Sequence, residues 1–68
     1  MKNQIKILRE EFNFTQQYLA EKVKVSRQTI ISLESGKYNP SIFLAHKIAG
    51  VFHKTIEEVF IFEEDDDE

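Results

Sequence analysis

Two neighbouring side chains, Arg27 and Gln28, carry planar groups that can form paired hydrogen bonds. An arginine can donate two bonds to O6 and N7 of guanine, and a glutamine can pair in the same way with N6 and N7 of adenine. Ile31 and Ser32 follow at a spacing that places them on the same face of a helix, and Ile31 could contact a thymine methyl group. These four residues could therefore read base edges, whereas the alternative is an ordinary exposed helix face.

Residues suited to catalysis or metal binding are too scattered to form a site. His46 and His53 are seven positions apart and could share a helix face, but they have no third ligand nearby and the chain has no cysteine. The glycines, Gly36 and Gly50, do not form a phosphate-binding loop. No nucleophile, base and orienting group stand at a workable spacing. We therefore expect no enzyme activity, cofactor, metal or small-molecule ligand.

Apolar periodicity and capping residues predict five short helices and hence an all-α fold. The helices are expected at about residues 3–12, 16–23 and 27–35, then from Ser41 to between Gly50 and His53, and from Thr55 to about Phe60. Four N-caps are predicted, at Thr15, Ser26, Ser41 and Thr55, the last in a capping box with Glu58. Pro40 disfavours helical geometry at Asn39, so the fourth helix has to begin after it.

The fourth helix should turn an apolar stripe toward the core. This stripe consists of Ile42, Leu44, Ala45, Ile48 and Phe52. Gly50 lies inside the pattern, where a glycine costs about 1 kcal/mol relative to alanine. We therefore expect another helix to pack closely at Gly50.

Residues 15–40 predict two short helices that meet through a tight turn, which is the helix-turn-helix arrangement. The chain resembles the Cro and phage-repressor type of helix-turn-helix regulators, the XRE family, over about residues 4–60. The shared features are Leu8-Arg9, Thr15-Gln16, Leu19-Ala20, Val25-Ser26-Arg27-Gln28-Thr29-Ile30, Leu33-Glu34, Gly36-Lys37, Asn39-Pro40-Ser41 and Ile48-Ala49. The resemblance implies a five-helix lambda-repressor-like domain whose third helix enters the major groove, with Gln28 as the strongest base contact. Arg27 is open to either base or phosphate contact.

The same resemblance implies phosphate contacts on both sides of the third helix. Gln16 stands at the start of the second helix, where backbone amides and the helix dipole favour an anion. Lys37 and Asn39 lie in the connector after the third helix and could follow the DNA backbone. Thr29 could bond either a phosphate or a carbonyl of its own helix, and the sequence leaves both open.

Arg9 and Glu34 occupy positions where the family has a buried or half-buried ion pair, although Glu34 could instead be a solvated helix end. Two turns depart from the family pattern. Lys24 stands where a glycine is frequent, and we expect it to adopt a positive φ at a cost of about 1 kcal/mol. Asn13 also replaces a usual glycine and tolerates the same left-handed geometry.

Val59, Phe60, Ile61 and Phe62 are consecutive apolar residues, and they cannot all lie on one face of a helix. Such a run suits a short β-strand whose edge would pair with a second copy. The short extension also resembles a minimal subgroup of the family that dimerises through a strand after the fifth helix. We therefore expect these four residues to form a dimer interface; the alternative is that they close the core of the monomer.

The net charge of −3 is unusual for a DNA-binding protein, but its distribution is uneven. Residues 63–68 are all acidic and are expected to form a disordered tail. Residues 1–62 carry nine basic against six acidic side chains, a net of +3, and are expected to form the DNA-binding domain.

No charged-then-apolar leader or long apolar span is visible, so a soluble, cytoplasmic protein is expected. We expect a homodimer that binds a palindromic operator in double-stranded DNA, because two recognition helices read two half-sites. Repression is expected from the absence of an activation domain. The alternative is an antitoxin or another partner-binding module with the same fold.

Overall fold

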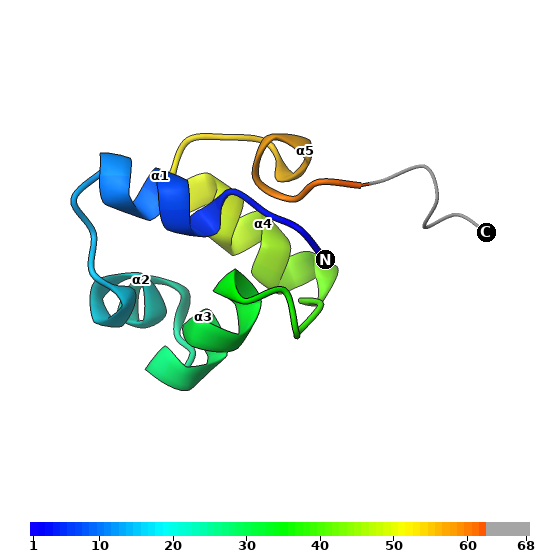
Figure 1. Ribbon diagram of the computed structural model, residues 1–68. Helices are drawn as coiled ribbons and strands as arrows, with labels where there is room; N and C mark the ends of the chain where they lie inside the picture. Colours follow the sequence, from blue (N-terminus) through cyan, green and yellow to red (C-terminus); the bar gives the residue numbers. More distant parts are fainter. Residues whose placement is uncertain (63–68) are drawn as a thin grey trace.

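The computed structural model describes residues 1–62, and the predicted acidic tail, residues 63–68, lies outside the described residues. Five helices follow one another along this part of the chain (Figure 1). They are α1 (Ile5–Glu11), α2 (Gln16–Val23), α3 (Arg27–Glu34), α4 (Ile42–Val51) and α5 (Ile56–Val59). The all-α prediction is confirmed, and the predicted helix ends differ from the observed ones by only a residue or two.

Four of the helices have the N-cap side chains that the sequence predicts. Thr15, Ser26 and Ser41 each accept a hydrogen bond from the backbone N–H three residues later. Thr55 does the same for Glu58, whose carboxylate accepts the Thr55 backbone N–H at 2.8 Å and completes the capping box. That backbone bond holds the pKa of the Glu58 carboxyl below its ordinary value. These caps satisfy amides that the first helical turns leave without partners.

The turns between helices use left-handed backbone geometry. Asn13 has φ 60° and Lys24, the C-cap of α2, has φ 62°, as expected for both. Gly36 adopts φ 81° directly after α3, a value glycine reaches without strain. His53 also has a positive φ, 58°, which no pattern in the sequence predicted. The Lys24 turn sets the path of the chain from α2 into α3.

One hydrophobic core holds the helices together. α2 packs against α3 and α4, α4 packs against α5, and α1 packs against α3. The core side chains are Ile5, Leu8, Leu19, Ala20, Val23, Ile30, Leu33, Ala45, Ile48, Ala49, Phe52, Val59 and Phe60. Val59 and Phe60 are only 0% and 1% exposed, so the prediction that their side chains form a dimer interface is wrong. A run of four apolar residues does not by itself distinguish a monomer core from an interface, and α5 turns these two inward.

The two ends of the described chain run beside each other (Figure 1). Asn3 and Phe60 form an antiparallel β-bridge. The Gln4 backbone N–H donates to the Val59 carbonyl at 2.7 Å, and the Ile61 N–H donates to the Lys2 carbonyl at 2.9 Å. Within residues 1–62 this isolated bridge is the only β-structure, so the predicted C-terminal strand is reduced to a single pairing with the chain's own N-terminal segment.

Two expectations for α4 are wrong. Gly50 is exposed, and no heavy atom outside the local backbone lies within 4 Å of the position that a Cβ would occupy, so no helix packs closely there. Ile42 was expected in the core but is 66% exposed. It lies in the first turn of α4, and an apolar hollow of about 230 Å³ borders it together with Phe60 and Phe62. Periodicity cannot show that this turn lies at the edge of the domain, where the described residues leave Ile42 largely exposed.

Candidate nucleic-acid interface

The outward face of α3 presents the side chains that the sequence singled out. Ile30 and Leu33 are fully buried and fix the opposite face of α3 on the core. Arg27 and Gln28 in the first turn are exposed, and Ile31 is half-buried. Because Ser26 caps this turn, the two long polar side chains are held at the very start of the helix, where their ends can reach outward.

A shallow groove of about 360 Å³ lies along α3 and the connector that follows it. It is lined by Ser26, Gln28, Thr29 and Ser32 on the helix and by Lys37 and Tyr38 in the connector. The structure thus brings Gln28, Ser32, Thr29 and Lys37 together, whereas Arg27, Ile31 and Asn39 lie outside this groove. Its lining offers an amide, hydroxyls and a cation, the groups that bind base edges and phosphates.

Tyr38 is a lining residue that the sequence analysis did not single out. Its side chain is 45% exposed, and it borders the groove beside Lys37. Its position between Lys37 and Asn39 could have indicated a phosphate contact, since a tyrosine hydroxyl can also bond a phosphate oxygen.

The Thr29 hydroxyl is hydrogen-bonded to Ser26, the N-cap residue of α3. The Thr29 Oγ1 lies 3.0 Å from the Ser26 Oγ, and the Thr29 backbone N–H donates to that same oxygen at 3.2 Å. Within the protein, the Thr29 hydroxyl thus bonds the Ser26 hydroxyl rather than a carbonyl of its own helix. A phosphate contact would require the hydroxyl to share or exchange the Ser26 bond.

A polar network joins α1, α2 and α3 behind this surface. The Arg9 Nε donates to the Glu34 Oε2 at 2.7 Å, and the Arg9 Nη1 donates to the Phe14 carbonyl at 2.9 Å. The two side chains of the ion pair are 13% and 7% exposed. The bond to the Glu34 carboxylate raises the pKa of the Arg9 guanidinium above its ordinary value. Arg9 and Glu34 are thus an ion pair that fixes α3 against α1.

Gln16 belongs to the same network, because its Nε2 donates to the Glu34 Oε1 at 3.1 Å. The side-chain amide of Gln16 is therefore engaged with protein. At the start of α2 the Tyr18 N–H is bonded to the Thr15 hydroxyl, whereas the Gln16 and Gln17 backbone N–H groups have no partner within their helix. The start of α2 remains suited to an anion through those backbone groups. Lys37 and Asn39 are exposed on the other side of α3.

The N-terminal segment holds the end of α3. The Asn3 Nδ2 donates to the Leu33 carbonyl at 2.8 Å, and its Oδ1 accepts the Ile5 backbone N–H at 3.1 Å. The Met1 amino group donates to the Gly36 carbonyl at 2.9 Å. These bonds satisfy carbonyls at the end of α3 and so fix the connector that carries Lys37. Sequence reasoning missed Asn3, because nothing in the pattern indicates a contact 30 residues away.

The remaining surface offers little for other chemistry. Within residues 1–62 no group of three or more His, Cys, Asp or Glu side chains is placed to hold a metal ion. No helix in this part of the chain is long and apolar enough to cross a membrane. The α3 face is therefore the best candidate for a functional surface in the described residues.

Comparison with known proteins identifies relatives along almost the whole chain. A family profile described as helix-turn-helix matches residues 5–59. A protein of Archaeoglobus fulgidus named as an HTH-type transcriptional regulator is 54% identical over 66 residues, which are 97% of this chain and 93% of the relative. The immunity repressor protein of Bacillus phage phi105 is 41% identical over 46 residues, which are 68% of this chain and 32% of that protein.

Solved structures share the fold. The structure of a complex of the SinR and SinI proteins matches with a TM-score of 0.78 at 26% sequence identity, over 93% of this chain. This chain spans only 62% of that protein's length, so the similarity concerns the helical domain described above.

Proposed function

This chain belongs to the helix-turn-helix family of DNA-binding transcriptional regulators, and we propose that it is a repressor that binds a palindromic operator as a homodimer. α3 enters the major groove of the operator, and the complex forms in the cytoplasm. The observation that carries this proposal is the outward face of α3, where Arg27 and Gln28 are exposed at the first turn of a helix anchored on the core.

The residues divide into those that read bases and those that grip the DNA backbone. Gln28 bonds an adenine, Arg27 bonds a guanine or a phosphate, and Ile31 contacts a thymine methyl. Ser32 lines the groove beside Gln28, and its shorter side chain contacts the same base pairs. These contacts lie at the start and middle of α3, the part of a recognition helix that reaches base edges.

Phosphate contacts flank the helix on both sides. The α2 start with Gln16 binds one phosphate through its backbone amides. Lys37 and Asn39 bind the backbone on the other side, and Thr29 adds a hydroxyl in between. In this arrangement Gln16 contributes mainly through its position, because its side-chain amide is bonded to Glu34.

A second copy supplies the second recognition helix. A single α3 touches few base pairs, whereas two linked helices read half-sites about 34 Å apart, one turn of DNA. Ile61 and Phe62 are exposed at 36% and 59%, and they are the members of the C-terminal apolar run that remain available for a dimer contact.

Repression follows from the simplest use of such a dimer. A protein seated over a promoter blocks polymerase sterically and needs no further domain. The resemblance to the immunity repressor of phage phi105 supports this direction of regulation. A partner-binding role with little DNA activity is the second candidate, favoured by the exposed apolar residues Phe43 and Phe62.

Selection of fragments of the source genome by the purified protein separates the two candidates. The binding is done near 150 mM salt with excess random competitor DNA, because nonspecific binding weakens steeply with salt. A shared palindrome upstream of genes, with half-sites one helical turn apart, is the expected result. No enrichment of any sequence would contradict DNA recognition and favour the partner-binding role.

A further inference from the structure

We propose that the acidic segment of residues 63–68 binds within its own chain to the Lys37 end of the groove along α3, and that it competes there with DNA phosphates. The inference rests on the proposed function and deepens it by adding a regulation of the phosphate-binding surface. The segment lies outside the described residues, whereas the groove that receives it and the point from which it starts are both described.

The groove along α3 carries the groups that hold a carboxylate. Lys37 lines it together with the hydroxyls of Ser32 and Tyr38 and the amide of Gln28, and none of its lining residues within the described chain is acidic. A carboxylate resembles a phosphate in offering negatively charged oxygens that accept hydrogen bonds, so the same donors bind both. Within residues 1–62 no side chain forms an ion pair or hydrogen bond with the Lys37 ammonium. The groove therefore suits an anionic segment as well as DNA.

The N-terminal segment connects the end of the described chain to Lys37 (Figure 1). The Ile61 N–H donates to the Lys2 carbonyl at 2.9 Å, and the Met1 amino group donates to the Gly36 carbonyl at 2.9 Å. One peptide unit in each partner segment completes the path, so the Ile61 nitrogen and the Lys37 Cα are at most roughly 16 Å apart. Lys37 thus lies close to the point where the acidic segment starts.

The acidic segment is long enough to reach this cation. At about 3.3 Å per residue, the seven residues that follow Ile61 span at most roughly 23 Å, which exceeds the upper bound on the distance to Lys37. A short tether also gives an effective concentration of the order of millimolar. Ion pairs too weak to hold a free peptide can therefore form within the chain.

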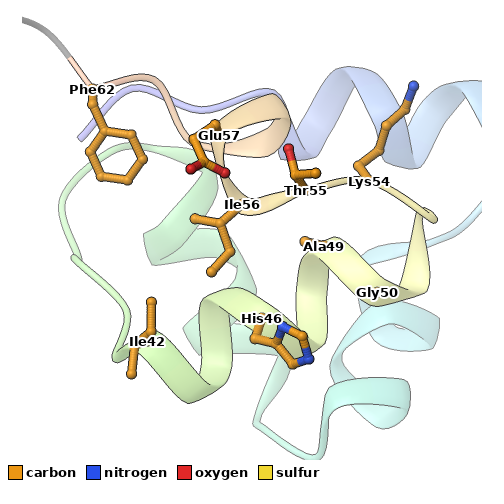
Figure 2. Close-up of a pocket in the computed structure, with 9 residues that line it drawn as sticks. All are labelled: Ile42, His46, Ala49, Gly50, Lys54, Thr55, Ile56, Glu57 and Phe62. Atoms are coloured by element: carbon orange, nitrogen blue, oxygen red, sulfur yellow. The ribbon is translucent and has the colours of Figure 1, made fainter.

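Lys54 is a second cation near the end of the described chain, but its surroundings suit the segment less well. It lines a hollow of about 480 Å³ together with Phe62, the last described residue (Figure 2). Glu57 lines the same hollow, so an acidic segment that entered it would meet a like charge within screening distance. Charge therefore favours the groove at Lys37 over this hollow.

Binding at Lys37 sets the segment and DNA in competition, because DNA must displace the carboxylates before Lys37 can contact a phosphate. Salt weakens the ion pairs of the segment and those of DNA alike. Removing the negative charges should therefore tighten DNA binding most at low salt. We expect about a tenfold gain, which is about 1.4 kcal/mol and within the range of two exposed ion pairs.

A neutral-segment variant of the full chain tests the competition. It keeps the length of the chain and removes all six charges through Glu63→Gln, Glu64→Gln, Asp65→Asn, Asp66→Asn, Asp67→Asn and Glu68→Gln. Anisotropy titrations compare it with the wild type on the operator and on a random duplex, because a phosphate contact reads no sequence. The variant should bind both duplexes about tenfold more tightly at about 50 mM salt and within about twofold at about 300 mM. Equal affinities of the two proteins at both salt concentrations would overturn the proposal.

A double-variant cycle separates binding at Lys37 from repulsion of DNA at a distance. In a Lys37→Ala background, neutralising the segment should change DNA affinity by less than about twofold. Lys54→Ala is the matched control, since it removes the same charge outside the groove, and there the gain should stay about tenfold. A gain that Lys37→Ala leaves unchanged would show that the segment only repels DNA, and it would overturn the contact at Lys37.

Amide spectra without DNA give a direct readout of the contact. Between the wild type and the neutral-segment variant, the largest shift changes outside the residues next to the segment should be those of Lys37 and Tyr38. They should vanish at about 1 M salt, where the Debye length is about 3 Å. Changes centred on Lys54, or changes that disappear on dilution and so report contact between copies, would overturn the proposal.

The outcomes distinguish this inference from the proposed function. If the wild type and the variant select the same operator with equal affinity and give the same amide shifts at Lys37, the regulator function stands and this inference fails. If the shifts at Lys37 and the effect on random DNA appear as described but no operator is selected, the proposed function fails and the contact within the chain stands.

Discussion

Replacing Arg9 with methionine should strongly destabilise the domain, because it removes the charge that compensates Glu34. The Glu34 side chain is only 7% exposed, and without Arg9 its carboxylate keeps the Gln16 amide, at 3.1 Å, as a hydrogen-bond donor. Breaking one side of a buried ion pair costs about 3–5 kcal/mol. Since Arg9 is 13% exposed and water can enter the space it leaves, we expect about 3 kcal/mol, from the lower end of that range.

This loss is large for a chain of 68 residues, whose unfolding free energy should be roughly 3–10 kcal/mol. Urea unfolding followed by circular dichroism measures it. The double variant Arg9→Met with Glu34→Leu should recover to within about 1 kcal/mol of the wild type, because no charge is then left uncompensated. Glu21→Ala is the control, since it breaks an exposed contact to Gln17 and should cost less than about 0.5 kcal/mol. An Arg9→Met cost below about 1 kcal/mol would show that Glu34 is effectively solvated and refute the reasoning.

Three further changes test other parts of the structure. Lys37→Ala should weaken binding to operator and random DNA alike and lower the salt slope of log K by about 1, as anisotropy titrations would show; a loss at one base position alone would refute a phosphate contact. Lys24→Gly should stabilise the domain by about 0.5–1 kcal/mol in urea unfolding, because φ 62° strains a non-glycine residue; a loss of stability would disprove that strain. The pKa of Glu58 is lowered in the folded state, so this carboxylate stabilises the fold above its unfolded-state pKa, and the stabilisation is lost as the pH falls through the folded-state pKa. Glu58→Gln should therefore make the melting temperature depend less on pH between about pH 5 and pH 3. A pH dependence equal to that of the wild type would contradict this.

Local signals account for much of what the sequence predicted correctly. The caps at Thr15, Ser26 and Ser41 and the capping box at Thr55 depend on neighbours within one helical turn, and such bonds can be read from spacing. The positive φ at Lys24 followed from the family resemblance, since a glycine is frequent at this position of the turn. The outward position of Gln28 followed from the inward stripe on α3.

The predictions that failed depend on what lies across the fold. Whether Phe60 faces the core or a partner is decided by α5 and the N-terminal segment, which the apolar run does not reveal. The exposure of Ile42 and the open space at Gly50 depend on where α4 extends past its neighbours. Asn3 reaches Leu33 through a contact with no local pattern. Periodicity identifies a face of a helix, but it does not show which part of that face another element covers.

The most direct test of the central claim, that the exposed start of α3 reads DNA sequence, is an anisotropy titration of Gln28→Ala at about 150 mM salt. Wild type and variant are each titrated with the selected operator and with a random duplex of equal length. We predict a loss of about 1–3 kcal/mol on the operator, or roughly 5- to 150-fold, with binding to random DNA unchanged. An equal loss on both duplexes, or no loss on the operator, would contradict the assignment of α3 as the element that reads the sequence.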